Sequence, residues 1–420
     1  MSSAVPAPPD ASRLHLAVVP QNPILPLDNG GKIRNFHLLS ALAKRHRLSV
    51  LLTQPPPEAQ LQELRNAGMN PISLPKPALR HLAYLQNMAR GVPLDFAVQA
   101  NPSVKGWLRR HAGEVDLVLV VSIGPSLSVP RNLGRPVVVD TQNIEWVRRP
   151  SELSADVEPL RRLRRRLMGA GTASFERRVL GASDRVYVCS ADERALLRAA
   201  GIDHVAVVPN GVDLEGIRPS PEPPEGDLVL FPGDLGYPPN IVASAWIAGA
   251  IAPAIRARTD RCRLVVAGRD ASGDLRATLA AADVEVRSPV ADMRDMLATS
   301  SVVLVPLKSG GGTRLKILEA FGAGRAVVST RVGAEGIEAE HGRHLLIADT
   351  PEDIADAVIG LLRDPARRRE LAAEARRLAE ERYGWAAIGA GMADDLEALV
   401  TGSPTQGVVA TAGARRGREA

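Results

Sequence analysis

The chain has 420 residues, of which 45% are hydrophobic and 24% are charged, a composition typical of globular domains. This length exceeds that of most single hydrophobic cores, so we expect two domains. The formal net charge is +5, but only 3% of the residues are aromatic and no aromatic-plus-basic recognition motif occurs, so no nucleic-acid partner is predicted.

Short apolar runs rich in Val and Leu alternate with helical patterns along the first half of the chain. This alternation is typical of βαβ units, in which helices cover both faces of a parallel sheet. The expected strands are 14–20, 47–53, 115–122, 136–143, 185–190 and 205–210, and helical patterns cover 32–46 and 153–180.

A Pro-rich, charged segment, RPSPEPPEGD at 218–227, predicts a linker between two domains. A second series of strands and helices follows it. The expected strands are 228–233, 263–268, 284–288, 301–307, 326–330 and 345–349, and the expected helices are 240–258, 272–282, 291–299, 313–322, 351–363, 365–384 and 385–400. We therefore expect two doubly wound α/β domains, with ligands bound beyond the carboxyl ends of the strands.

The domain boundaries are expected to follow these elements. We predict a disordered N-terminus at 1–12, a first domain at 13–215, a linker at 216–227, a second domain at 228–382, a C-terminal crossover helix at 383–400 and a disordered tail at 401–420. The two termini are small and polar in composition, which is typical of disordered segments.

The cysteines, the N-terminal sequence and one basic run bear on the compartment and the surface of the protein. Cys189 and Cys262 lie far apart without a CxxC or His-rich motif, so neither a disulfide framework nor a zinc site is predicted. The first residues lack the basic and apolar regions of a signal peptide, and we expect a cytoplasmic protein. The basic run from Arg161 to Arg166 is either the solvated face of a helix or a contact with an anionic membrane, in which case the protein is peripheral on the inner face.

Three consecutive glycines at 310–312 follow a predicted strand and precede a helical pattern that opens at Thr313. Glycines let the backbone approach a ligand closely, and the amides and dipole of a helix N-terminus favour an anion. A phosphate is the natural occupant, and Thr313 can cap the helix. The alternative is a flexible turn followed by a surface helix.

Two residues of that helix favour a ligand site. The chain has only six lysines, and one of them is Lys316, where an ammonium group would meet a phosphate. Glu319 lies in a helix-to-strand passage of buried character, where a carboxylate needs a partner. The hydroxyl groups of a sugar or a ribose would supply one.

From 228 to about 382 the sequence resembles the second domain of GT-B glycosyltransferases, in particular the retaining glycosyltransferase family 4. The motifs that carry the resemblance are VPNGVD (208–213), FPGDLGYPPN (231–240), LVVAG (264–268), GGGTRLKILEAFGAGRAVVST (310–330) and GAEGI (333–337). The resemblance implies the GT-B fold, with two Rossmann-like domains facing a central cleft and a C-terminal helix that returns to the first domain. It also implies a UDP- or GDP-linked sugar donor, with no metal or other cofactor required.

The same resemblance implies roles on the donor side. Glu319 would bind the ribose diol, the glycine loop and its helix would surround the diphosphate, and the segment 288–290 would lie near the base. Asn240 would order the loop after the first strand of the second domain. The donor-binding residues implied are Gly31, Gly233, Asp234, Asn240, Val290, Gly311, Gly312, Thr313, Arg314, Lys316 and Glu319.

The first half carries a weaker but consistent resemblance. NGGKIRNFHLLSALAKRH (29–46) is similar to the family's glycine loop and helix, and implies an acceptor side of Gly30, Arg34 and His37. DTQNIEW (140–146) resembles the family's DxHNxE, so Asn143 and Glu145 would face the cleft. His37, Asn143 and Glu145 are the catalytic candidates, although a lone His on an amphipathic helix is more often structural.

The sequence also departs from the family pattern. Gly311 stands where many members carry a Glu, Gln142 stands where relatives often have His, and no Arg/Lys pair follows the first strand of the second domain. Arg314 and Lys316 would supply that positive charge from the glycine-loop helix. No side chain is placed as a nucleophile, which is compatible with departure and attack on the same face of the sugar.

Three functions are open at this point. The first is a retaining glycosyltransferase that acts on a glycan, a lipid-linked or a small-molecule hydroxyl acceptor in polysaccharide or glycoconjugate biosynthesis. The second is a nucleotide-sugar epimerase, although the paired carboxylates and histidine of that enzyme's motifs are not seen. The third is a non-catalytic nucleotide-binding or interaction protein on the same scaffold, which a turnover assay would separate from the first.

Overall fold

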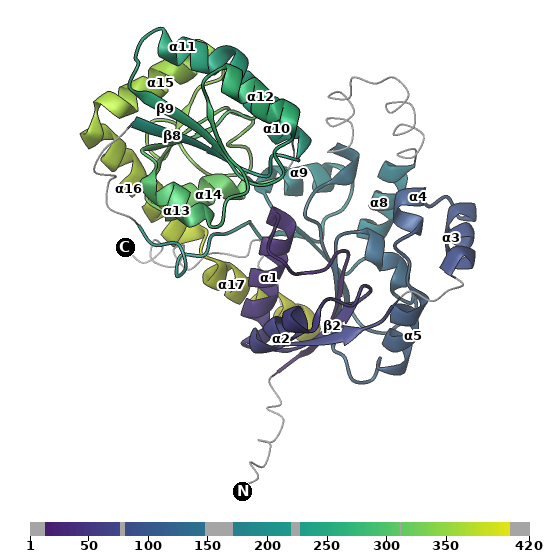
Figure 1. The fold of residues 1–420 in the computed structure, drawn as a ribbon. Coiled ribbons are helices and arrows are strands. Elements are labelled where there is room, and N and C mark those ends of the chain that lie inside the picture. The colour runs from purple at the N-terminus through teal and green to yellow at the C-terminus, as the bar shows by residue number, and fades with distance from the viewer. Residues whose placement is uncertain (1–12, 76–79, 148–170, 220–226, 311, 404–420) are drawn as a thin grey trace, which may run out of the picture.

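The computed structural model describes residues 13–75, 80–147, 171–219, 227–310 and 312–403. These residues form two α/β domains, each built on one parallel sheet with helices on both faces (Figure 1). The expected fold of two doubly wound domains is confirmed.

The first domain is built on a seven-stranded parallel sheet in the order β3-β2-β1-β4-β5-β6-β7. Its strands are β1 His15–Pro20, β2 Arg47–Leu52, β3 Met69–Ser73, β4 Leu117–Val121, β5 Val137–Asp140, β6 Arg185–Val188 and β7 Val205–Val207. Because successive side chains of a strand point to opposite faces, Leu16 and Val18 pack into one core layer and Ala17 and Val19 into the other.

Different helices cover the two faces of this sheet. One layer is closed by α1 Gly30–Ala43, α2 Glu58–Asn66 and α17 Trp385–Thr401. The other is closed by α4 Leu94–Ala97, α5 Pro102–Arg110, α8 Thr172–Gly181 and α9 Ala191–Ala199, and α3 Arg80–Ala89 lies beside α4. The long apolar runs of the sequence are therefore strands that are buried on both faces.

The second domain contains a six-stranded parallel sheet in the order β10-β9-β8-β11-β12-β13. The strands are β8 Asp227–Pro232, β9 Cys262–Ala267, β10 Glu285–Arg287, β11 Val302–Val305, β12 Ala326–Ser329 and β13 Leu346–Ile347. The helices are α10 Pro238–Trp246, α11 Ala252–Arg256, α12 Gly273–Ala281, α13 Met293–Thr299, α14 Leu315–Gly322, α15 Pro351–Arg363 and α16 Pro365–Arg382. The central strands β8 and β11 adjoin, so the strand order reverses beside them, as in other doubly wound sheets.

Strand β3 was not predicted from the sequence. β3 contains Pro71 and polar residues, and it lies at the edge of the first sheet. Proline lacks the N–H that a central strand needs, but an edge strand tolerates it. Pro71 and the polar residues weaken the sequence signal for a strand at 69–73, and the edge position is what allows the sheet to include them.

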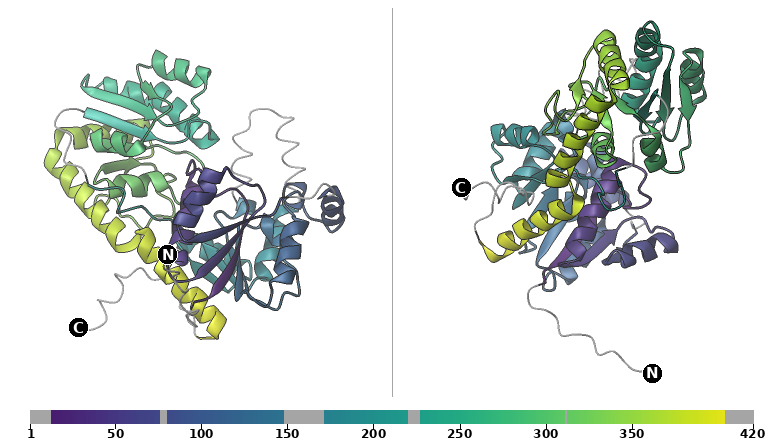
Figure 2. Two further views of the ribbon diagram at one scale, coloured as in Figure 1. Left: turned by 60° about the horizontal axis from the view of Figure 1, so that its bottom comes forward. Right: turned by 90° about the vertical axis from the view of Figure 1, so that its left-hand side faces the viewer.

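Helix α17 crosses from the second domain back to the first (Figure 2). Trp385, Ile388 and Met392 are buried in the core layer that also contains α1. The buried carboxylate of Asp395 accepts a hydrogen bond from the Tyr187 hydroxyl at 2.8 Å. The expected return of the C-terminal helix to the first domain is confirmed.

One helical stretch, Pro238–Arg256, is long and apolar enough to span a membrane by length and composition. Half of its apolar window is buried, and Ile247, Ile251 and Ile255 belong to the core of the second domain. A turn of π-helix at Ile247–Ile251 interrupts it. These observations indicate that the stretch packs in the core of the second domain.

The contact between α1 and α17 gives a first prediction. An ideal Cβ atom at Gly389 would lie 2.2 Å from the Cβ atom of Ala41, so Gly389→Ala must push the helices apart. We expect this variant to lose about 1–3 kcal/mol of unfolding free energy in urea denaturation. At Gly360, an exposed residue of α15, no atom lies within 4 Å of such a Cβ, so Gly360→Ala should gain up to about 1 kcal/mol. Equal responses of the two variants would contradict the packing described here.

Candidate active site

Residues from both domains line one cavity of about 720 Å³. They lie in loops that follow the strands of both sheets and in the helices that those loops lead into, which is where open parallel sheets bind ligands. The first domain contributes Leu27, Asp28, Asn29, Gly30, Gly31, Ile33, Arg34, Gln142, Asn143 and Asn210. The second domain contributes Pro232, Gly233, Asp234, Tyr237, Pro239, Asn240, Gly268, Arg269, Val290, Met293, Leu307, Ser309, Gly310, Gly312, Thr313, Arg314, Leu315, Lys316 and Glu319.

The glycine loop adopts a backbone that needs glycine. The φ angles of Gly310 and Gly312 are 121° and 73°, values that other residues rarely adopt. Gly311 lies outside the described residues. The two glycines turn the chain from β11 into α14 and bring its backbone to the wall of the cavity.

The helix after this loop begins later than expected. The expectation that Thr313 opens and caps it is wrong, because Arg314 has an extended backbone and α14 begins at Leu315. The Thr313 hydroxyl instead donates to the carbonyl oxygen of Gly336 at 3.4 Å. Helix α14 has no hydrogen bond from a capping side chain, so its positive end is open to an anion in the described part of the loop.

Lys316 is held in a defined position at the cavity wall. Its Nζ atom donates to Oδ1 of Asn240 at 2.9 Å and lies 4.3 Å from the ring centroid of Phe231. The amide of Asn240 in turn donates to the carbonyl oxygen of Asp234 at 2.7 Å. A Cβ atom at Gly233 would lie only 2.8 Å from the lysine Nζ, so the missing side chain at this position makes room for the ammonium group.

Burial changes the titration of both charged groups on α14. Burial, assisted by the nearby Arg314 charge, lowers the pKa of Lys316 to about 7. Burial also raises the pKa of Glu319, and the Lys316 charge opposes that shift. Lys316 is therefore divided between its charged and neutral forms near neutral pH, and a bound anion would favour the charged form.

Arg314 supports the loop from within the protein. Only 8% of the residue is exposed, and its guanidinium donates to the carbonyl oxygen of Gly312. A Cβ atom at Gly310 would lie 3.2 Å from Nη2 of this arginine. Burial lowers the pKa of Arg314. The arginine thus adds positive charge close beneath the loop.

The first domain touches the glycine loop directly. The amide of Asn210 donates to the carbonyl oxygen of Thr313 at 3.2 Å. A Cβ atom at Gly312 would lie 3.0 Å from Oδ1 of Asn143, and one at Gly30 would lie 3.1 Å from the Leu315 side chain. The loop is therefore positioned by both domains.

The absence of a side chain at Gly31 leaves space for the Gln142 side chain. A Cβ atom there would lie 2.4 Å from Oε1 of Gln142. The Gln142 amide donates to Oδ1 of Asn35 at 2.7 Å. Gln142 thus joins the DTQN loop to helix α1.

Arg34 lines the cavity, and its guanidinium group makes buried contacts within the first domain. Its side chain is 1% exposed and makes a two-pronged ion pair with Asp140, at 2.7 and 3.2 Å. Nη1 also donates to the carbonyl oxygen of Pro209 and to Oδ1 of Asn210, both at 3.0 Å. Burial disfavours the charge, but Asp140 outweighs it and raises the pKa of Arg34. These contacts tie α1 to the ends of β5 and β7.

Two of the three catalytic candidates do not line the cavity. His37 stacks on Trp385 of the crossover helix, with ring centroids 5.5 Å apart and an interplanar angle of 2°, and burial lowers its pKa. At Glu145 the backbone N–H donates to the buried carboxylate of Glu176 at 3.0 Å. Asn143 is the one candidate among the cavity-lining residues of the described chain.

Sequence reasoning overlooked a charged contact across the mouth of the cleft. Arg269, two residues after the end of β9, pairs with Asp234 at 2.5 Å and with Asp28 of the first domain at 3.5 Å. Asp28 also pairs with Lys32 at 3.0 Å. The only available signal was the position of Arg269 immediately after the LVVAG strand.

Family models match both halves of the chain. A model described as glycosyl transferases group 1 matches residues 226–364, and one described as glycosyltransferase family 4 matches residues 29–215. Among curated proteins, a D-inositol 3-phosphate glycosyltransferase of Kineococcus radiotolerans is 31% identical over 52% of this chain and 58% of its own length. An uncharacterized 44.6 kDa protein from the cps region of Klebsiella pneumoniae is 26% identical over 37% of this chain and 42% of its own length. The chain thus spans about half the length of the curated relatives it matches.

Solved structures share the fold over almost the whole chain. HepE from Anabaena, in complex with UDP, has a TM-score of 0.67 and 16% identity over 92% of this chain and 100% of that one. Sucrose-phosphate synthase from Thermosynechococcus elongatus has a TM-score of 0.66 and 18% identity, covering 93% and 100%. At these identities the likeness shows the fold.

The Arg34–Asp140 pair gives a second prediction. Arg34→Met leaves the Asp140 carboxylate buried without its partner, so we expect a loss of about 3–5 kcal/mol of unfolding free energy. The exposed Arg45–Asp394 pair provides the matched control, and Arg45→Met should cost below about 1 kcal/mol. Urea denaturation measures both. The double variant Arg34→Met/Asp140→Leu should recover stability, and a loss as large as in the single variant would contradict the ion-pair explanation.

Proposed function

Because the chain belongs to the glycosyltransferases of group 1 and family 4, with their GT-B fold, we propose that it moves a sugar from a nucleoside diphosphate to a hydroxyl acceptor with retention of configuration. The observation that carries this proposal is the position of Lys316. Its Nζ atom is held by Asn240 at 2.9 Å beside the glycine loop and the open end of α14. Such a group of donors suits a diphosphate.

Several residues around Lys316 complete the proposed donor site. Backbone amides at Gly312 and the start of α14 would contact the phosphates, since glycine permits the close approach. Glu319 lies one turn beyond Lys316 on the same helix and lines the same cavity, and its carboxylate would accept hydrogen bonds from the ribose diol. Val290 would lie near the base. UDP is the first nucleotide to test, because the Anabaena HepE structures contain UDP and UDP-glucose.

The proposed chemistry depends on charge at the leaving group. As the bond between the anomeric carbon and the phosphate oxygen breaks, negative charge grows on the diphosphate. The Lys316 ammonium, the loop amides and the α14 dipole are fixed in advance and would stabilise that charge in the transition state. The carboxylates in the described cavity wall belong to Asp28, Asp234 and Glu319.

These carboxylates favour a mechanism without a protein nucleophile. Asp28 pairs with Lys32, and Asp234 pairs with Arg269, so both are held as salt-bridge partners. Glu319 is assigned to the ribose. The departing diphosphate oxygen would accept the proton of the acceptor hydroxyl as that oxygen attacks from the same face. Among the described residues no group of three or more His, Cys, Asp or Glu side chains could hold a metal ion, and a metal-independent reaction stays a prediction.

The acceptor is proposed by class only. Two curated relatives are named D-inositol 3-phosphate glycosyltransferase, after a polyol phosphate, and another is named as a protein in a cps region. We propose a polyhydroxylated acceptor of polysaccharide or glycoconjugate biosynthesis, bound against Asn29, Asn143 and the start of α1. The proposed membrane contact of Arg161 to Arg166 lies outside the described residues.

A third prediction tests the donor site by ligand-dependent stability. UDP at about 100 times its dissociation constant should stabilise the native protein by about 2.7 kcal/mol. Glu319→Ala should remove most of this stabilisation, because the ribose loses its carboxylate partner. The exposed Glu63 of α2 provides the control, and Glu63→Ala should respond to UDP as the native protein does. If UDP, GDP and their sugar conjugates all leave the melting temperature unchanged, the donor proposal fails.

The fourth prediction follows from the lowered pKa of Lys316, which is about 7. Below that pH the ammonium group is already charged and UDP binding takes up no proton. Above it, binding must protonate the lysine, so affinity should fall by up to about tenfold per pH unit. Calorimetry in two buffers with different ionisation enthalpies at about pH 8.5 should show uptake of close to one proton.

The control for this experiment is Lys316→Gln, which should bind UDP more weakly with little pH dependence between neutral and alkaline conditions. Glutamine keeps a donor for Asn240 but carries no titrating charge. Undiminished proton uptake in this variant would show that another group is responsible. No uptake in the native protein would show that the lysine is not the diphosphate partner.

A further inference from the structure

Helix α3 lies at the outer edge of the first domain, on the side away from the second domain (Figure 1). It follows β3, the edge strand of the first sheet, and it contacts α4. Every described side chain of this helix is at least partly exposed to solvent. The helix therefore adds little to the core of its domain, and its outer face stays accessible.

The outer face of α3 carries apolar side chains. Leu85 is 62% exposed, the largest value among the large hydrophobic residues of the described chain, and Met88 is 44% exposed. Because residues three apart lie on the same face of a helix, these two side chains are neighbours. Leu94 opens α4, the helix that contacts α3, and is 40% exposed. We call these three residues the apolar group, since three within ten residues exceed the scattered exposure that is ordinary on protein surfaces.

Four cations extend from the end of α3 across α5. Arg90 directly follows α3, Lys105 and Arg109 belong to α5, and Arg131 lies in the loop before β5. The three arginines are exposed and the lysine is partly buried. We call these four residues the basic cluster. From 80 to 110 the sequence contains five Lys or Arg residues and one carboxylate, that of Asp95.

The cations of the basic cluster act on one another. Burial lowers the pKa of Lys105, and the charges of Arg109, Arg90 and Arg131 lower it further. Within the described chain none of these four side chains forms an ion pair or a hydrogen bond. Like charges that lie close together repel one another, and an anionic partner would offset that repulsion.

The apolar group and the basic cluster belong to one flank of the molecule. Figure 1 shows α3 and α5 along the outer side of the first domain, and the left view of Figure 2 again places this dark blue and blue part of the chain opposite the second domain. A broad, flat partner can therefore contact the first domain here without displacing the second.

We propose that the apolar group and the basic cluster form one docking surface for an anionic lipid bilayer. The cations would meet the phosphate headgroups, and Leu85 and Met88 would enter the boundary between the headgroups and the acyl chains. A soluble polyanion would satisfy the cations but would leave the apolar side chains in water. The surface is separate from the basic run Arg161 to Arg166, and it does not depend on the proposed sugar transfer.

The test sediments the full chain with vesicles of phosphatidylcholine alone and with vesicles that also contain phosphatidylglycerol. We expect at least about tenfold stronger partition into the anionic vesicles, because several cations near an anionic leaflet each favour binding. Raised salt should weaken this partition, since it screens the charges of the exposed arginines.

Two variants test the two parts of the surface separately. Leu85→Gln/Met88→Gln removes exposed apolar side chains and keeps helix-forming residues on α3, and Arg90→Gln/Arg109→Gln removes two exposed charges. Each variant should lower the partition into anionic vesicles about tenfold or more. Leu85→Gln alone is the milder variant in case the double variant is unstable in urea denaturation.

The matched control is Leu196→Gln/Arg198→Gln on α9. It removes one exposed leucine and one exposed arginine from another helix of the same domain. This variant should bind anionic vesicles as the native protein does.

The proposal requires both parts of the surface, so it is overturned if either test variant sediments as the control does. It is also overturned if the native protein binds neither kind of vesicle or binds both equally. A dimer in sedimentation velocity that Leu85→Gln/Met88→Gln dissociates would assign the apolar group to a second copy of the chain and contradict the bilayer. The UDP response is measured without vesicles, so a failure at α3 leaves the donor site testable.

Discussion

The proposed donor site depends on the placement of one lysine in a space that a glycine leaves open. Lys316 comes from the helix after β11, but its ammonium group lies against Gly233, the residue directly after β8. These strands are neighbours at the centre of the second sheet. A side chain on Gly233 would displace the ammonium group and Asn240 together, so the charge, the amide and the glycine form a single structural unit.

The contact between the domains depends on a second cation, the buried guanidinium group of Arg34. Arg34 joins the start of α1 to Asp140 at the end of β5 and to Asn210 beyond β7. Asn210 then donates to the carbonyl oxygen of Thr313 in the glycine loop. One continuous chain of hydrogen bonds therefore runs from the first domain to the donor loop. Arg34, an acceptor-side candidate by sequence, lies in the cavity lining and uses its guanidinium group in these buried contacts.

Local sequence patterns were sufficient to predict most of the fold. Buried parallel strands read as apolar runs, and the pattern of 385–400 predicted the last helix. The return of this helix to the first domain was implied only by the family resemblance, and most of the expected linker lies outside the described residues. The glycine loop, Lys316 and Glu319 were predictable because their relation is local, within one loop and one helix. The missed strand β3 and the late start of α14 at Leu315 depend on edge position and on the backbone of Arg314, which carry little compositional signal.

Contacts between distant segments could not be predicted in the same way. Asp140 lies 106 residues beyond Arg34, and the Arg269–Asp28 contact joins the two domains. His37 had the spacing of a cleft residue, but the crossover helix presents Trp385 to its ring.

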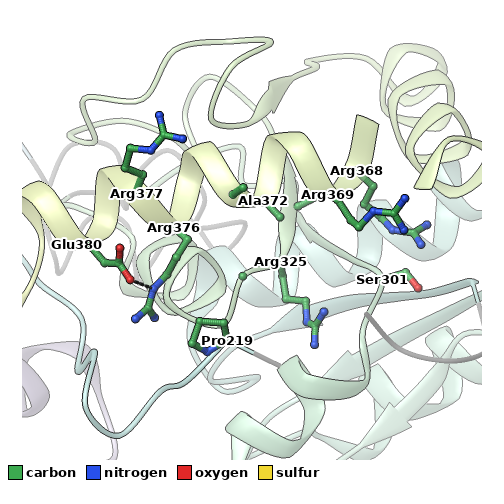
Figure 3. A pocket seen from close by; sticks show the side chains of 12 residues that line it. Pro219, Ser301, Arg325, Arg368, Arg369, Ala372, Arg376, Arg377 and Glu380 are labelled. Carbon is green, nitrogen blue, oxygen red and sulfur yellow. Dashed lines mark hydrogen bonds and ion pairs between the residues drawn. The ribbon is translucent and has the colours of Figure 1, made fainter. Parts of the chain in front are cut away.

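The two ends of the second sheet carry cations of different chemical character. At the carboxyl end Lys316 has a pKa of about 7, so its charge depends on pH and on whether an anion is bound. At the amino end the guanidinium groups of Arg325 and Arg376 (Figure 3) donate to backbone carbonyl oxygens of Leu297 and Ile217, so they join helices and loops of the protein. A site for a leaving group benefits from charge that responds to the ligand, whereas the arginines at the amino end support the packing of the domain. Helix α14 begins at the carboxyl end and ends at Gly322, whose carbonyl oxygen accepts a hydrogen bond from Arg376 at the amino end. One short helix therefore connects the two groups of cations.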